Sequence, residues 1–468
     1  MNYIKSIIPW LFQNNDEQAF DAAIDLPDGK MYGNRLFYGI LSVIFLFLAF
    51  LFYSGTNFRL LGPPFGGIGG QDFRQILRAS REILERENIY QHAIPYAESP
   101  NFAEFKMWSA APYPYSPIVA VLAMPFTVFD EDAVLAFWTA LSWLLLIASS
   151  ILIVIGILKE KNFFKLLAVL LFFCMYGPVH LNLTLVQLDI LILFLLSLTF
   201  FLYQKQSIYA GIILGLAISL KLLVAPLVVY FLWKKDWKTS AVAFATFGLL
   251  TMIGFSVAGW RLLGDFIKVN YLWNVTAMLS YPFNQSLNGI GIRLFTHNAY
   301  IEPLFVFPPL VALLRVLGSL TVIVLWLKSV THQDNRATVA GFLEYGLTLS
   351  TMLFLSPLVD DIHYVWLLLP LGALLALVSK SISIRKRSVL SLFTVLSALF
   401  LADPDLHDAI YHGWENLMYH NALVSQKYAI LTGAYLYGLI FLELILVLTI
   451  KFFRQKEFMS KEILVGQQ

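Results

Sequence analysis

Long runs without a charged residue are the feature that most constrains this chain. Leu36 to Thr56, Ala133 to Leu158 and Thr239 to Trp260 are the clearest of them. Each has at least the roughly 20 residues that a helix needs to cross the hydrocarbon core of a bilayer. Backbone groups find no water at that depth, so only helices or closed barrels can span it. Because the runs are continuously apolar and do not alternate, we expect helices.

The composition supports the same fold class along the whole chain. Hydrophobic residues make up 59% of the 468 residues and charged residues only 13%, which is about half the charged share of a soluble domain. We predict an all-α polytopic membrane protein, a single domain over residues 1–468 with about 12 transmembrane helices (about 11 to 13). The net charge of +2 gives no reason to expect a nucleic-acid partner, and the single Cys174 excludes a disulfide within the chain.

The distribution of basic residues predicts the orientation of these helices. The basic clusters lie near residues 159–165, 205, 234–238, 328–336, 385–387 and 451–456. The positive-inside rule places them in the cytoplasm, together with residues 1–35 and the tail 451–468. The segments then expected outside are 57–114 (a large first loop), 180–187, the surroundings of Lys221, 261–302, 356–363 and 403–426.

One short apolar segment conflicts with this orientation. Ser116 to Phe129 is too short for an ordinary span, yet counting it as one reverses the side of everything that follows. Either the segment is re-entrant or the cluster at Lys159 breaks the charge rule, and the sequence leaves both alternatives open.

Within the first loop, the segment DFRQILRASREILERENIY has the spacing of an amphipathic helix. Phe73, Ile76 and Leu77 begin an apolar face with spacings of three and four. Arg78 with Glu82, and Arg81 with Glu85, are i,i+4 pairs on the other face. We expect this helix to lie along the membrane surface.

The polar residues around these segments allow both structural and functional interpretations. Asp72 could be the N-cap of the amphipathic helix or a catalytic residue. Tyr115 belongs to an aromatic cluster that could be an interfacial belt or a platform for a sugar or prenyl chain. Asp189 is costly in lipid and should face the bundle. Lys221 either has an anionic partner or extends its amine to the interface.

Further polar residues occur beside or inside later apolar runs. Asp361 and His363 stand at the entrance of a span, where they could assist proton transfer, bind phosphate or sugar, or form a solvated turn. Arg315 and Glu443 lie inside apolar runs. We expect both to face the interior of the bundle and to pair with polar groups there.

Six short motifs follow one another in an order that resembles a known family. They are Asp72-Phe73 with Asn88-Ile89-Tyr90; Tyr115-Ser116-Pro117; Asn182 with Val186-Gln187-Leu188-Asp189; Gly211, Gly215, Lys221 and Pro226; Asn284, Ser286, Leu287, Gly289 and Arg293; and Ser356, Pro357, Asp361 and His363. This order resembles the GT-C superfamily of membrane glycosyltransferases. It is most similar to glycosyltransferase family 87, the polyprenyl-phosphate-mannose-dependent α-mannosyltransferases. The family's pattern has glycine, asparagine and histidine where this chain has Val186, Asp189 and Ile362.

The resemblance implies an inverting transfer of a sugar, mannose in this family, from a polyprenyl-phosphate donor to a hydroxyl of a glycolipid or glycan. The reaction would take place on the outer side of the cytoplasmic (plasma) membrane, without a metal or a tightly bound cofactor. Asp72 would be the general base, and Lys221, with Arg293 second, would bind the donor phosphate. Residues that would contact sugar or lipid are Tyr115, Gln187, Asp189, Asn284, Asp361 and His363.

Two other functions remain open from the sequence. A transporter or flippase of a lipid-linked saccharide should show a repeated half with broken helices, and we find no such repeat. A catalytically inactive assembly subunit with the same fold is favoured by the departures at Val186 and Ile362.

Overall fold

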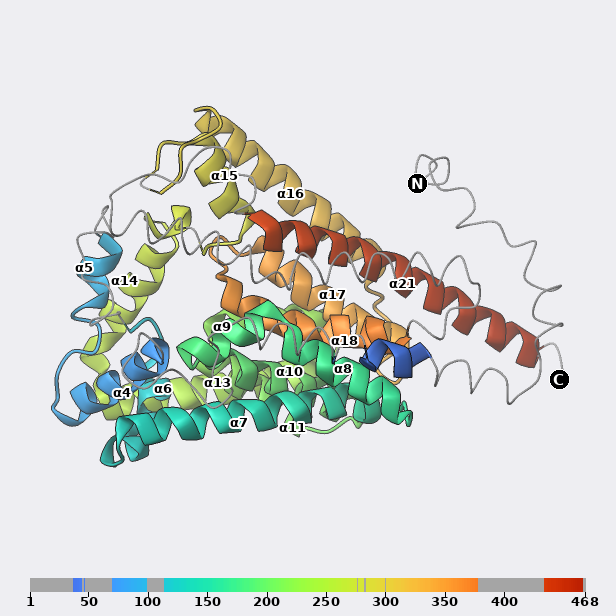
Figure 1. Cartoon of the computed structure of the whole chain (residues 1–468), viewed down its shortest axis with the longest axis horizontal. Helices are drawn as coiled ribbons and strands as arrows, with labels where there is room; N and C mark the ends of the chain where they lie inside the picture. The colour runs from blue at the N-terminus through green and yellow to red at the C-terminus, as the bar shows by residue number, and fades with distance from the viewer. Residues whose placement is uncertain are drawn as a thin grey trace.

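The computed structural model describes residues 37–43, 46, 70–98, 113–275, 277–281, 283–298, 300–377 and 433–465 (Figure 1). Several predictions lie outside these residues. They are the N-terminal segment 1–35, most of the apolar run from Leu36 to Thr56, the parts 57–69 and 99–112 of the first loop, the basic cluster 385–387 and the segment 403–426.

The described residues form helices and connecting loops. In chain order the helices are α4 (Gln71–Leu84), α5 (Ala93–Glu98), α6 (Pro117–Ala123), η3 (Met124–Val128), α7 (Glu131–Ile151), η4 (Leu152–Ile157), α8 (Phe163–Met175), α9 (Gly177–Leu185), α10 (Asp189–Gln204), α11 (Tyr209–Leu220), η5 (Leu222–Leu227), α12 (Val228–Trp233), α13 (Trp237–Ala258), η6 (Trp260–Leu262), α14 (Leu263–Trp273), η7 (Ala277–Ser280), α15 (Leu287–Phe295), α16 (Pro308–Ser329), α17 (Val339–Leu355), η8 (Asp361–Leu367), α18 (Leu368–Leu377) and α21 (Ala434–Val465). The predicted all-α class is therefore confirmed over this part of the chain.

Four helices in the described residues are long and apolar enough to cross a membrane. They are Glu131–Ile157, Trp237–Ala258, Pro308–Ser329 and Ala434–Gln455. The first two confirm the spans predicted from Ala133 and from Thr239. The pair α8 and α9 passes the same test as one span bent by 58° at Gly177-Pro178, because proline cannot continue the helical hydrogen-bond ladder. The remaining apolar helices are shorter, so the predicted count of about 12 is not confirmed.

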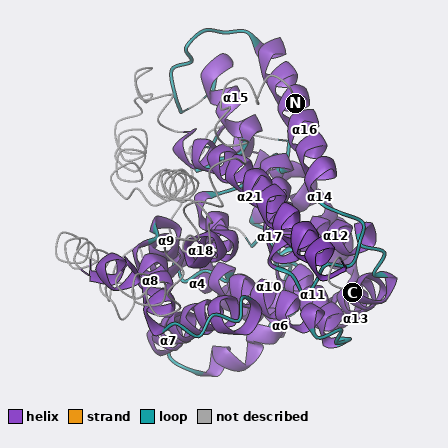
Figure 2. Cartoon of the chain, turned by 90° about the vertical axis from the view of Figure 1, so that its right-hand side faces the viewer, coloured by secondary structure: helices purple, strands orange, loops and turns teal. Residues whose placement is uncertain are grey.

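The long helices run along the length of the molecule. Figure 1 shows α7, α16 and α21 extending lengthwise, with α4, α5 and α14 at the end opposite the C-terminus. In the end-on view of Figure 2, α10, α17 and α18 lie near the middle, and α7, α13 and α16 lie toward the outside. Burial agrees with this arrangement, because every residue of α18 is buried whereas α13 and α16 bury only a few of theirs.

Two glycines allow a close contact between α11 and α13. A Cβ added to Gly211 would lie 2.7 Å from the Thr239 carbonyl oxygen, and one added to Gly215 would lie 2.5 Å from that of Ala243. Both glycines face α13, so only hydrogen at these positions lets α11 pack against it. The glycine-rich motif is therefore structural, and it fixes the helix that ends at Lys221.

The basic clusters meet at one end of the bundle. Lys159 and Lys205 both contact the Phe201 ring, and Arg336 lies over the Tyr203 ring at 4.4 Å. Buried Glu344 accepts hydrogen bonds from Lys234 and Arg454. Clusters that are far apart in sequence thus share one end, as the charge rule requires of a common side of the membrane.

The segment from Pro117 to Val128 begins and ends at the opposite end of the bundle. Its 12 residues form α6 and η3, which are too short for a span. Ala120 in α6 accepts a hydrogen bond from Ser80 of α4, and Glu131, just after η3, pairs with Arg81 of the same helix. The segment therefore returns to the side where it started. This favours the re-entrant alternative and leaves the charge rule intact at Lys159.

Helix α4 is amphipathic as predicted, but its apolar face is covered by protein. Phe73, Ile76 and Leu77 are at most 1% exposed, and α4 packs on α6 and η3. The apolar face of α4 therefore packs against protein, and the expected position of the helix along the membrane surface stays a prediction. Arg78 pairs with Glu82 at 3.7 Å as expected, whereas Arg81 pairs with Glu131 and not with Glu85.

Glu443 fulfils the expectation for a carboxyl group inside an apolar run. It is 2% exposed and accepts hydrogen bonds from Ser350 and Thr351 at 2.7 Å and 3.0 Å. These contacts join α21 to α17 in the middle of the bundle.

Candidate functional site

Asp72 stands in the first turn of α4 but does not cap the helix. The N-cap residue is Gly70, which adopts a left-handed conformation (φ 77°) and makes no side-chain cap hydrogen bond. The predicted N-cap role of Asp72 is therefore wrong. Its carboxylate instead accepts hydrogen bonds from Gln75 Nε2 at 2.8 Å and from Gln187 Nε2. The first partner is three positions away in the same helix and the second is 115 positions further along the chain, so a local and a tertiary contact together orient the acid.

The electrostatic surroundings of Asp72 suit an acid–base group. Burial raises the pKa of Asp72 to about 6, while the hydrogen bond from Gln187 and the charge of Lys221 oppose the rise. An acid with this pKa is ionised near neutrality, yet it holds a proton more readily than an ordinary aspartate.

Gln187 is held from several sides, which fixes the orientation of its amide. Its Oε1 accepts a hydrogen bond from the Tyr115 hydroxyl at 3.2 Å, so Nε2 is the atom that faces Asp72. Its backbone N–H donates to the Asn182 carbonyl at 2.8 Å, and its carbonyl accepts from Trp138 Nε1 at 3.3 Å. The predicted site residues Asp72, Tyr115 and Gln187 therefore form one connected network.

The turn that presents Gln187 passes through a left-handed residue. Val186 has φ 54° and ψ 56° and ends α9. A β-branched side chain is disfavoured there, whereas glycine adopts this conformation freely. Val186 therefore holds this backbone conformation at some cost, and it is a conformation that suits the glycine of the resembling motif.

Lys221 and Asp189 form a buried ion pair beside this network. Lys221 Nζ donates to Asp189 Oδ2 at 2.6 Å, and the two residues are 9% and 0% exposed. The ring of Trp366 lies 6.0 Å from the lysine nitrogen. The predicted anionic partner of Lys221 is thus Asp189, and the alternative of a lysine reaching out to the interface is excluded.

Asp360 belongs to the same cluster, although the motif comparison selected its neighbour Asp361. Burial and the charge of Asp361 raise the pKa of Asp360 to about 7, and Lys221, Asp72 and Asp189 also act on it electrostatically. His363 Nδ1 lies 3.0 Å from the Asp360 carbonyl oxygen, and its ring packs edge-on against Trp366. The signal in the sequence was the adjacent acid pair, of which Asp360 is the member that faces the other charges.

Two other predicted site residues hold loops together. The Asn284 amide uses all four of its hydrogen-bonding positions: Nδ2 donates to Leu279 O and Pro357 O, and Oδ1 accepts from Ser286 N and Val359 N. A side chain that is fully satisfied in this way positions Asp360 and is not open to a ligand.

Arg293 is fully buried in α15. Its Nη1 donates to the carbonyls of Tyr281 and Asn284 at 2.7 Å and 2.8 Å. No electrostatic contact connects Arg293 to Asp72 or Lys221 among the interactions described. A role for Arg293 in phosphate binding therefore remains a prediction.

Asp361 is buried at the start of η8, where its Oδ1 accepts from the Ile362 N–H at 2.9 Å. Among the described residues, His, Cys, Asp and Glu do not gather in groups of three or more that could hold a metal ion. The site that the structure assembles consists of Asp72, Tyr115, Gln187, the Lys221–Asp189 pair and the Asp360–His363 segment.

The candidate site thus has an acid of raised pKa and a buried lysine at one end of an apolar helical bundle. Comparison with known proteins gives the family: residues 113–357, more than half of the chain, match the model of glycosyltransferase family 87. The chain belongs to this family. Asp72, Asp361 and His363 lie outside the matched residues.

One curated relative is similar over part of its length. It is a polyprenol-phosphate-mannose-dependent alpha-(1-2)-phosphatidylinositol mannoside mannosyltransferase of Mycobacterium tuberculosis, 28% identical over 163 residues. The alignment covers 32% of this chain and 38% of the relative. No solved structure matches this chain.

The left-handed conformation of Val186 predicts that Val186→Gly is more stable than Val186→Ala, the reverse of the usual order in a helix. Alanine at this position keeps the left-handed strain of about 1–2 kcal/mol, whereas glycine relieves it. Because glycine costs roughly 0.5–1 kcal/mol in backbone entropy, Val186→Gly should be up to about 1 kcal/mol more stable than Val186→Ala. Thermal unfolding of the purified proteins in detergent measures the difference.

Val179 provides the matched control, since it is a buried valine within the helical part of α9. There glycine should be less stable than alanine by about 1 kcal/mol, the usual order for a helix. The same order at both positions would contradict the left-handed assignment.

Proposed function

We propose that this protein transfers mannose from a polyprenyl-phosphate donor to a hydroxyl group of a glycolipid or glycan acceptor at the outer face of the membrane. The observation that carries this proposal is the juxtaposition of the Asp72 network with Lys221, whose charge acts on the Asp72 carboxylate. The donor named for the mycobacterial relative agrees with a cation for phosphate next to a base for a hydroxyl.

Asp72 is proposed as the general base. A polyprenyl phosphate is already a good leaving group, so the main need is removal of the acceptor proton as the oxygen attacks the anomeric carbon. One carboxylate on the acceptor side gives a single displacement with inversion. Gln187 and Gln75 each donate to a different carboxylate oxygen, which stabilises the ionised form and fixes its direction.

Lys221 is proposed to receive the phosphate of the donor. In the unliganded arrangement Asp189 neutralises its charge at 2.6 Å, so the incoming phosphate replaces or shares that partner. A fixed cation at this point stabilises the negative charge that develops on the departing phosphate oxygen. Tyr115 and His363, which flank the two charged groups, are proposed to contact the sugar.

Replacing the base should remove the transfer reaction while the fold is retained. Asp72→Asn keeps the size of the side chain and is expected to lower kcat by about 10²–10⁴-fold. The rate of transfer is measured in proteoliposomes, as incorporation of labelled mannose from polyprenyl-phosphate mannose into acceptors from a membrane extract.

Asp132→Asn is a suitable control, because Asp132 is an exposed acid at the same end of the bundle that pairs with Arg74. It should keep wild-type turnover. A folded Asp72→Asn variant with wild-type turnover would refute the base assignment. Movement of the lipid-linked sugar across the vesicle without product would support a transporter instead.

The pH dependence of the reaction should report the raised pKa of Asp72. The base must be ionised, so kcat/KM should fall as pH drops through about 6, by about tenfold per unit below it. The measurement is the pH profile of kcat/KM at low donor concentration. A profile that stays flat down to the ordinary aspartate pKa of about 4 would contradict the assignment.

A further inference from the structure

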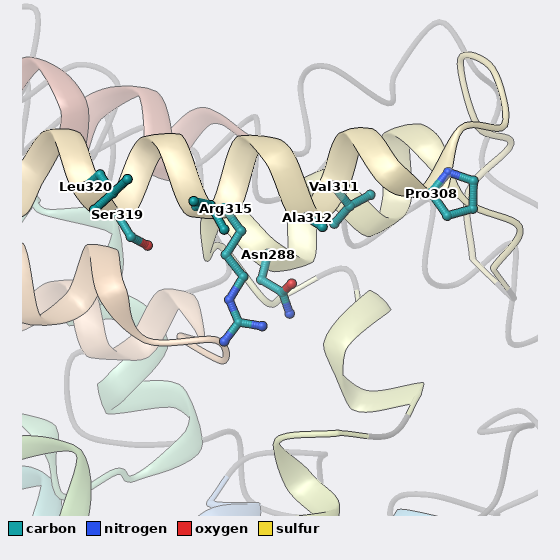
Figure 3. Close-up of a pocket in the computed structure, with 8 residues that line it drawn as sticks. Asn288, Pro308, Val311, Ala312, Arg315, Ser319 and Leu320 are labelled. Carbon is teal, nitrogen blue, oxygen red and sulfur yellow. The ribbon is translucent and has the colours of Figure 1, made fainter.

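A second polar feature lies between α15 and α16, and none of its residues belongs to the Asp72 cluster. A pocket of about 640 Å³ opens between α15 and α16, within the usual size range of ligand sites. Its walls include Pro308, Val311, Val316 and Leu320, and its polar residues are Arg315, Asn288 and Ser319. Figure 3 shows the side chains of Arg315 and Asn288 extending to the same side, one from each helix.

Arg315 occupies an unusual place for a charged residue. It lies about two turns, or about 10 Å, past the start of α16, a helix long and apolar enough to cross the membrane. The expectation that Arg315 faces the bundle interior is wrong, because its side chain is exposed. Within the described part of the chain it has no hydrogen bond or ion pair. A cation at membrane depth is costly unless an anion accompanies it.

Asn288 adds an independent observation. It is 6% exposed and lines the same pocket, and its Nδ2 has no hydrogen-bond partner within the described residues. A buried donor without an acceptor costs free energy, so a ligand with acceptor atoms is favoured there. The guanidinium and the amide together offer several N–H groups, which suits an anion with several oxygens.

The walls of the pocket indicate what is attached to this anion. Val316 and Leu320 are each 55% exposed, and both line the pocket. Such a surface suits an alkyl or prenyl chain that runs along the helix below its head group. A free phosphate ion would gain nothing from these apolar walls and would have to leave water to enter.

We propose that the groove between α15 and α16 is a binding site for a phosphate-bearing membrane lipid. Arg315 and Asn288 bind the phosphate, and the chain of the lipid lies along Val316 and Leu320. None of these residues belongs to the Asp72 cluster, so the site is separate from the proposed transfer site. The proposal does not depend on the sugar-transfer function, and it is tested by binding alone.

The test is lipid binding to the full-length protein in a non-ionic detergent, measured by native mass spectrometry. The probe is dioleoyl phosphatidylglycerol, and dioleoylglycerol, which has the same chains without phosphate, is the comparison. Arg315→Gln should weaken binding of the phospholipid by at least about tenfold, since it removes a charge-assisted contact. Arg315→Lys should retain most of the binding, because it keeps the charge.

Lys328→Gln is the matched control, an exposed basic residue near the other end of the same helix. It should leave binding at Arg315 unchanged. Asn288→Asp tests the second contact. It should weaken binding of the phospholipid, because it adds a negative charge beside the phosphate. Since Arg315 is exposed, its substitution does not disturb the packed core, and the unfolding temperature confirms this.

Three results would overturn the proposal. One is equal binding by wild-type protein and Arg315→Gln. Another is equal binding of dioleoylglycerol and the phospholipid, which would leave the charge without a role. The third is full displacement of the lipid by millimolar inorganic phosphate, which would assign the groove to a soluble anion.

Discussion

The hydrogen bond from Gln187 to Asp72 joins two parts of the chain that the sequence keeps 115 positions apart. It attaches the start of a helix outside the spans to the turn between α9 and α10. The backbone contributes to the same junction, since Gly70 N–H donates to the Thr184 carbonyl at 2.8 Å. Without this junction the carboxylate would have no fixed direction, and the buried charges around Lys221 would lose a neighbour that is ionised near neutrality.

Other contacts in the fold bring Lys221, Asp189 and Asp360 close to the Asp72–Gln187 hydrogen bond. The close contact of α11 with α13 through Gly211 and Gly215 sets where Lys221 emerges. The left-handed turn at Val186 reverses the chain so that Asp189 begins α10 facing that lysine. Asn284 ties a third loop to the segment that carries Asp360. Five segments that are distant in sequence thus meet at one end of an apolar bundle.

Much of this was predictable, because hydropathy and charge act over long, regular stretches. The spans from Ala133 and Thr239, the shared end of the basic clusters and the acid before an amphipathic helix follow from composition and period. What sequence could not supply were choices made by tertiary contacts. Aspartate commonly caps a helix, but Gly70 is the N-cap here and the Asp72 carboxylate accepts hydrogen bonds from Gln187 and Gln75. Asn284 and Asp361 both occupy motif positions. Asn284 holds two loops together through four hydrogen bonds, and the charges of Lys221, Asp72 and Asp189 act on Asp360, the neighbour of Asp361.

The orientation of single charged residues was equally beyond the sequence. Arg315 and Glu443 both interrupt apolar runs, but only Glu443 finds partners inside the bundle. The difference lies in the neighbouring helix. Helix α17 offers hydroxyl groups to Glu443, whereas Arg315 lies beside Asn288 of α15 and forms no ion pair within the described residues. This difference depends on which helices pack against each other, and the hydropathy pattern of a single segment does not determine that.

The central claim is that Lys221 binds the donor phosphate while Asp72 stays directed at the acceptor. A structure of the full-length protein with polyprenyl phosphate bound tests it most directly. The account predicts a phosphate oxygen within hydrogen-bonding distance of Lys221 Nζ, with the Asp72–Gln187 contact retained. Phosphate bound only in the groove at Arg315, with the Lys221–Asp189 pair undisturbed, would contradict it.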